Sequence, residues 1–189
     1  MQPLVGRNLQ HVLAALLLLS RLGDLSSTYL VTPTLKLESN DLVRRLGWKY
    51  AILTLLIAVA PYYNPQMAMV ILVPSLLVSA SNISKIWAAR TMGEDEYADY
   101  VQAIARRSKL PHALYTVAGQ CFFIMLAGVT LWMLSPDPDR DWGYWFGLGL
   151  MAYAFAMGFH STIYYVRLFR SVSDTRGGRA GVNAGSSRA

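Results

Sequence analysis

Residues 9–32, LQHVLAALLLLSRLGDLSSTYLVT, form the first of five long apolar segments, and they carry two charges, Arg21 and Asp24. A charge near the centre of a bilayer costs roughly 3 kcal/mol by insertion experiments, so ionisable residues are rare there unless they pair or have a function. Arg21 and Asp24 are one helical step apart, so each can partly neutralise the other. Thr28 follows Asp24 on the same helical face. We therefore predict a structural ion pair between Arg21 and Asp24 on a helix with a polar face.

The composition of the whole chain is that of a membrane protein. Of its 189 residues, 54% are hydrophobic and 15% are charged, whereas about a quarter of a soluble domain is charged. A transmembrane helix needs about 20 apolar residues. Five segments reach or approach this length: 8–31, 47–63, 67–88, 112–134 and 142–167. The sequence predicts an all-α membrane helix bundle with five transmembrane helices, in a single integral membrane domain over residues 1–170.

The polar connections add one more helix and a tail. Residues 94–108 carry Tyr97, Tyr100, Val101 and Ile104 on one face of a helical pattern. This spacing predicts an amphipathic helix on the cytoplasmic interface, and a helix that docks a soluble partner is the alternative. Residues 171–189 are rich in Ser, Gly and Arg, which predicts a disordered cytoplasmic tail.

The distribution of basic residues predicts the orientation in the membrane. The net charge of +6 is spread over segment ends and forms no continuous patch, which argues against nucleic-acid binding. Lysines and arginines follow the first, third and fifth segments, whereas the acidic run Asp137, Asp139 and Asp141 lies in the loop after the fourth. By the positive-inside rule, the N-terminus lies outside and the C-terminus in the cytoplasm of a prokaryotic plasma membrane.

Polar residues of several segments fall at a similar depth, in the cytoplasmic half of this topology. We predict a shared polar cavity open toward the cytoplasm, with ligand-binding residues Asp24, Thr28, Glu38, Asn40, Asn82, Gln120 and His160. The alternative is that these side chains only join helices through interhelical hydrogen bonds. For Glu38 and Asn40, capping of the second helix is an equally good interpretation.

Asp24, Glu38 and His160 have side chains that bind transition metals, but no metal-binding spacing is present, so no metal site is predicted and the cofactor is left open. The single Cys121 excludes a disulfide within the chain. Gly143, Gly147, Ala154 and Gly158 form a small-residue pattern that permits close helix contact, either within the chain or in a homo-oligomer.

Residues 15–88 resemble a family of small prokaryotic multipass membrane proteins of unknown function. The resemblance rests on DLSST at 24–28, ESN at 38–40 and Lys49; Asp41 stands where that family has a proline. It implies that Asp24, Thr28, Glu38 and Asn40 act as one unit.

Three functional hypotheses follow from these patterns. The first is a small transporter-like or accessory subunit whose polar cavity around Asp24 binds a small polar ligand, a cation or a lipid headgroup. The second is an intramembrane enzyme, acting on a lipid or peptide, that uses Asp24, Glu38 and His160. The third is a membrane scaffold that assembles through the fifth helix. The sequence does not decide whether the chain is an enzyme.

Overall fold

In the computed structural model, the described parts of the chain consist of helices joined by short connections. The structure describes residues 3–35, 41–138 and 141–186, and the side chains of 8–35, 43–138 and 141–173. Glu38 and Asn40 lie outside these ranges. The elements, in chain order, are α1 (Pro3–Val31), α2 (Asp41–Leu53), the 3-10 helix η1 (Thr54–Val59), α3 (Ala60–Tyr63), α4 (Pro65–Met92), α5 (Glu94–Arg107), α6 (Leu110–Leu134) and α7 (Trp142–Ser186).

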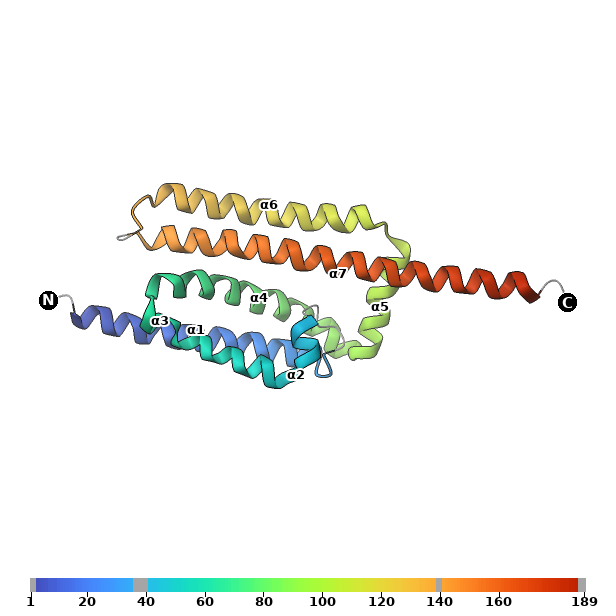
Figure 1. Cartoon of the computed structure of the whole chain (residues 1–189), viewed down its shortest axis with the longest axis horizontal. Coiled ribbons are helices and arrows are strands. Elements are labelled where there is room, and N and C mark those ends of the chain that lie inside the picture. The colour runs from blue at the N-terminus through green and yellow to red at the C-terminus, as the bar shows by residue number, and fades with distance from the viewer. Residues whose placement is uncertain (1–2, 36–40, 139–140, 187–189) are drawn as a thin grey trace.

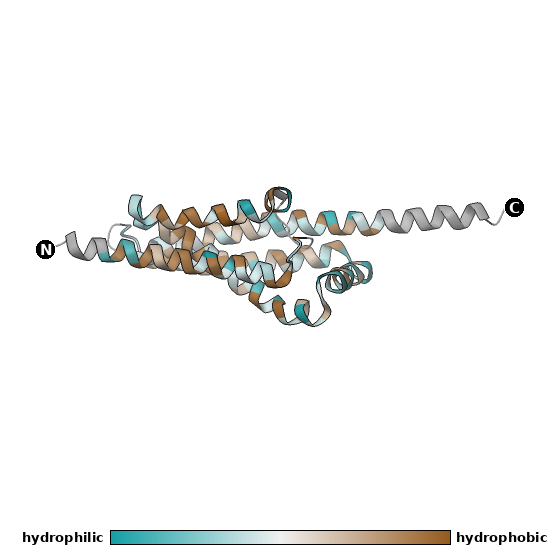
Figure 2. Ribbon diagram, turned by 90° about the horizontal axis from the view of Figure 1, so that it is seen from below, coloured by the Kyte–Doolittle hydropathy of each residue, from teal (hydrophilic) through white to brown (hydrophobic). Residues whose placement is uncertain are grey.

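In the part of the chain that the structure describes, five stretches are long and apolar enough to cross a membrane, which agrees with the number of long apolar segments in the sequence. They are Asn8–Val31, Val43–Tyr63, Pro65–Met92, Leu110–Leu134 and Trp142–Ser173. Much of their surface is apolar, with large exposed side chains such as Leu19, Leu56, Phe123 and Phe155, and Figure 2 shows apolar residues along the long helices. So much exposed apolar surface is unfavourable in water and ordinary in hydrocarbon.

The second of these stretches is not one regular helix, although the sequence predicted a span over 47–63. It is built from α2, η1 and α3. Gly47 interrupts the helical dihedral angles of α2 with φ 70° and ψ −166°, a conformation that favours glycine. Pro61 lies in the first turn of α3, where its missing N–H leaves no helical hydrogen bond unmade.

The four long helices lie side by side, in the order α1, α4, α7, α6 (Figure 1). Leu13 and Leu17 of α1 pack against Ala68 and Leu72 of α4 in the buried core. Because α4 contacts both α1 and α7, it lies between them and joins the two halves of the bundle.

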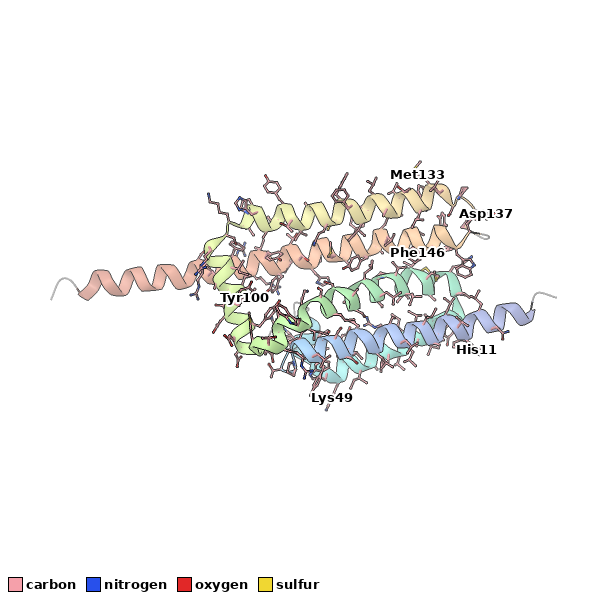
Figure 3. The ribbon with its side chains drawn as sticks, turned by 180° about the vertical axis from the view of Figure 1, so that it is seen from behind. His11, Lys49, Tyr100, Met133, Asp137 and Phe146 are labelled. Atoms are coloured by element: carbon pink, nitrogen blue, oxygen red, sulfur yellow. The ribbon has the colours of Figure 1, made fainter. Side chains whose placement is uncertain are left out.

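Helix α5 crosses one end of the bundle, where it contacts α4 and α7 (Figure 1). Its bounds confirm the helix predicted over 94–108, with acidic residues in the first turn and basic ones in the last. Figure 3 shows Lys49 and Tyr100 toward this end of the molecule, and His11 and Asp137 toward the other. Burial raises the pKa of Tyr97, and the neighbouring phenols of Tyr100 and Tyr165 raise it further.

Helix α7 continues beyond the bundle to Ser186 (Figure 1), where the sequence predicts a disordered tail from residue 171. A helix that projects alone has no tertiary packing to stabilise it, and short isolated helices are marginal in water. The disordered tail therefore stays a prediction.

Candidate functional site

A seam of polar side chains joins α1 to α4. The Ser79 hydroxyl lies within hydrogen-bond distance of two carbonyl oxygens, that of Ser75 on its own helix (2.9 Å) and that of Ser20 on α1 (3.1 Å). Gly23 of α1 lies opposite, and a Cβ atom added there would contact the Ser79 Oγ at 3.7 Å. Ser20 and Ser79 are both buried. Small side chains therefore let the two helices approach closely, and a hydroxyl satisfies a backbone carbonyl across the contact.

Three predicted site residues meet about one helical turn farther along this seam. The Asn82 side-chain amide donates to the Thr28 hydroxyl oxygen at 3.2 Å and to Oδ1 of Asp24 at 3.4 Å. The other carboxylate oxygen of Asp24, Oδ2, accepts from the Arg21 guanidinium at 3.0 Å. We call Asp24, Thr28 and Asn82 the Asp24 cluster.

The ion pair of Arg21 and Asp24 is thus present, and it lies largely inside the bundle. The two side chains are 20% and 14% exposed. The Nε of Arg21 is enclosed and has no hydrogen-bond partner. A buried donor without a partner costs about 1–3 kcal/mol. The contact with Asp24 therefore has to offset the cost of leaving the Nε of Arg21 unpaired.

The remaining predicted site residues that the structure describes lie elsewhere. Gln120 is exposed on α6, and His160 is exposed on α7, where its ring contacts that of Phe159 with 5.8 Å between centroids. The residues predicted to share one polar cavity are therefore not all together. Helix α4 separates α1 from α7, and depth along a helix does not determine which way a side chain points.

Gln120 borders a groove between α4, α6 and α7. The groove has a volume of about 400 Å³ and is lined by Ser81, Gln120, Phe123, Ile124, Tyr153 and Met157. Its position near the middle of the three helices places it at the level of the hydrocarbon centre when they span a membrane.

A carboxylate outside the predicted site, Glu94, joins the C-terminal end of α1 to α5. The Thr32 hydroxyl donates to Oε1 of Glu94, and the backbone N–H and hydroxyl of Thr34 donate to Oε2 at 3.2 and 2.9 Å. Glu94 lies in the first turn of α5, where a negative charge also suits the helix dipole. No local pattern indicates a contact between residues about 60 positions apart, so this contact could only be found from the tertiary structure.

The small residues of α7 face α6 within the same chain. A Cβ atom on Gly147 would lie 2.6 Å from the carbonyl oxygen of Gly128, and one on Gly158 would lie 3.0 Å from Sγ of Cys121. Ala154 is buried, and its carbonyl accepts from the Cys121 thiol at 3.3 Å. This face is therefore occupied inside the chain, and homo-oligomerisation stays a prediction.

Among the described residues, no group of three or more His, Cys, Asp or Glu side chains is arranged to hold a metal ion. Because Glu38 lies outside them, the set of Asp24, Glu38 and His160 is not tested as a whole.

Comparisons with known protein families, with curated proteins and with solved structures each find no match to this chain. The helices themselves indicate the class, a multi-pass α-helical membrane protein. The resemblance of residues 15–88 to a family of small membrane proteins remains an expectation.

Proposed function

We propose that the chain spans a prokaryotic plasma membrane five times, with its N-terminus outside and its C-terminus in the cytoplasm. The charge pattern supports this orientation, because basic residues gather on α2, in the last turn of α4 and in the last turn of α5, at the end of the bundle that carries α5: Arg44, Arg45, Lys49, Arg90, Arg106 and Arg107. Asp137 lies toward the other end (Figure 3).

Single-cysteine labelling tests this orientation. In a Cys121→Ser background, Pro136→Cys should react with a membrane-impermeant maleimide in intact cells, and Arg107→Cys should react only after lysis. The opposite pattern would reverse the orientation.

We further propose that the protein is a small transporter-like or accessory subunit, and that the Asp24 cluster binds a small polar ligand, a cation or a lipid headgroup. The observation that carries this proposal is the Asn82 amide, shared between Asp24 and Thr28 on the neighbouring helix. A carboxylate, a hydroxyl and an amide together offer both donors and acceptors to a polar ligand. At 3.4 Å the bond from Asn82 to Asp24 is longer than a typical hydrogen bond, so a ligand group can replace it at small cost.

The isosteric substitution Asp24→Asn tests the binding role. A ligand that binds only the folded protein raises its melting temperature. Purified protein in lipid nanodiscs would be heated with sodium, potassium or magnesium chloride, or after exchange into phosphatidylethanolamine or phosphatidylglycerol. At least one of these should raise the melting temperature of the parent, and Asp24→Asn should remove the effect.

Asp99→Asn is the matched control, because Asp99 is an exposed acid on α5. It removes the same charge outside the cluster and should keep the parent's response. If Asp24→Asn lowers stability and leaves every ligand effect unchanged, the cluster is a structural joint and the binding proposal is wrong.

The enzyme hypothesis has less support. It needs Asp24 and His160 in one site, whereas His160 is exposed on α7, where its ring contacts that of Phe159. The scaffold hypothesis would need a surface other than the small-residue face of α7, which packs on α6.

A further inference from the structure

The groove between α4, α6 and α7 holds three polar side chains whose hydrogen-bonding groups have no partner among the described residues. They are Ser81, Gln120 and Tyr153. Each comes from a different helix, and all three lie near the middle of a stretch long enough to cross a membrane. Polar groups without partners are costly at this depth, because hydrocarbon offers them no hydrogen bonds.

Tyr153 is the most informative of the three. The residue is only 7% exposed, yet its hydroxyl is not among the fully enclosed atoms that lack a partner. The ring is therefore largely buried between helices, whereas the hydroxyl keeps some exposed surface on a residue that lines the groove. A buried tyrosine normally finds a hydrogen-bond partner for its hydroxyl, so the arrangement calls for an acceptor inside the groove.

The other walls are suited to a flat apolar group. Phe123 and Ile124 of α6 and Met157 of α7 complete the lining. Aromatic rings pack well against other rings in offset or edge geometry, and methionine sulfur makes favourable contacts with them. The volume of about 400 Å³ lies in the range of small-molecule sites.

We propose that this groove binds a membrane-soluble quinone, a ring with carbonyl oxygens on a long apolar tail. The Tyr153 hydroxyl and the Gln120 amide donate to the carbonyl oxygens, the apolar walls hold the ring, and the tail extends into the surrounding lipid. This inference is independent of the Asp24 cluster, which lies at the contact of α1 with α4.

Two other occupants fit the groove less well. A phospholipid carries its ester and headgroup oxygens at the membrane surface, too far from the middle of the helices to meet these donors. A helix of a second copy is about 10–12 Å wide with its side chains, so it could touch the exposed Gln120, but its backbone would stay outside a groove of about 400 Å³.

The experiment measures binding of decylubiquinone to the full-length protein in lipid nanodiscs, by counting bound quinone after separation of the nanodiscs from free ligand. Binding should saturate at one quinone per chain. n-Decylbenzene, which has a ring and the same length of tail but no carbonyl, should not compete for the site.

Tyr153→Phe removes only the hydroxyl and should weaken binding about threefold to tenfold, the effect of one hydrogen bond. Gln120→Leu should weaken it similarly, and the double variant should abolish saturable binding. Tyr115→Phe on the exposed surface of α6 is the matched control and should bind like the parent.

Four results would overturn the proposal. One is the absence of saturable binding in the parent, and another is equal binding by the parent and the double variant. The third is competition by n-decylbenzene or by added phospholipid as strong as that by quinone, which would assign the groove to an acyl chain. If crosslinking instead shows a dimer through α6 that Gln120→Leu dissociates, a second copy is the occupant and the quinone assignment is wrong.

Discussion

Replacing Gly147 with alanine should destabilise the protein, although alanine is the better helix former. The added Cβ would lie 2.6 Å from the carbonyl oxygen of Gly128 and 2.8 Å from the backbone nitrogen of Trp132. Both obstacles are backbone atoms of α6, so no side-chain rotation can relieve the contact. To reach an ordinary distance of about 3.4 Å, α6 and α7 must separate locally by about 0.8 Å, a movement that also opens their shared packing.

The magnitude follows from two opposing terms. Overpacking a tight contact costs about 1–3 kcal/mol, and rigid backbone obstacles place this case near the upper limit. Alanine in place of glycine gains about 1 kcal/mol in helix propensity. We therefore expect Gly147→Ala to lower the free energy of unfolding by about 2 kcal/mol.

Gly119→Ala is the matched control on α6. A Cβ atom there would meet nothing within 4 Å, so this variant keeps the propensity gain without the clash and should be about 1 kcal/mol more stable than the parent. The two variants should thus differ by about 3 kcal/mol.

Equilibrium unfolding in mixed micelles of mild detergent and dodecyl sulfate measures this difference. Tryptophan fluorescence is a suitable signal, because Trp132 lies on α6 with its ring 6.2 Å from that of Tyr144 on α7. Equal stability of Gly147→Ala and Gly119→Ala would refute the close approach of the two helices.

Three further changes test other parts of the structure. Asn64→Ala should cost about 1 kcal/mol, because the Asn64 side chain caps α4 by accepting from the backbone N–H groups of Gln66 and Met67; unchanged unfolding in the same micelles would exclude the cap. Glu94→Gln should loosen the junction of α1 and α5, since an amide accepts hydrogen bonds more weakly than the carboxylate that Thr32 and Thr34 contact. Hydrogen exchange in the first turns of α5 should become faster, and unchanged protection would contradict the role of this contact. Because the pKa of Tyr97 is raised above 10.0, its contribution to stability is present below about pH 10 and is lost as pH rises through the folded-state pKa. Tyr97→Phe should therefore reduce the alkaline loss of stability, and an unchanged alkaline profile would argue against burial of this phenol.

Apolar length was the part of the fold that could be predicted from the sequence. Uninterrupted apolar residues over some 20 positions require a helix in hydrocarbon, because the backbone must satisfy its own hydrogen bonds there. A different pattern located α5, whose apolar residues recur at helical spacing between charged ones. The irregular second stretch was less predictable, because Gly47 and Pro61 can interrupt a helix but need not do so. That η1 and α3 pack against α1 is seen only in the tertiary structure.

The candidate site could be predicted only in part. The pairing of Arg21 with Asp24 is local, because residues three apart on a helix are neighbours. The contacts of Asn82 with Asp24 and Thr28 join residues more than 50 positions apart, and a common depth was the only indication of them. The same indication grouped Gln120 and His160 with Asp24, although they point elsewhere.

The sequence by itself determined that the chain forms long apolar helices, and where Arg21, Asp24 and Asn82 lie along them. The tertiary structure alone decided which faces of those helices meet. A helix can rotate about its axis freely until its side chains pack, and packing put Asn82 against α1, Gly147 against α6 and Tyr153 beside a groove.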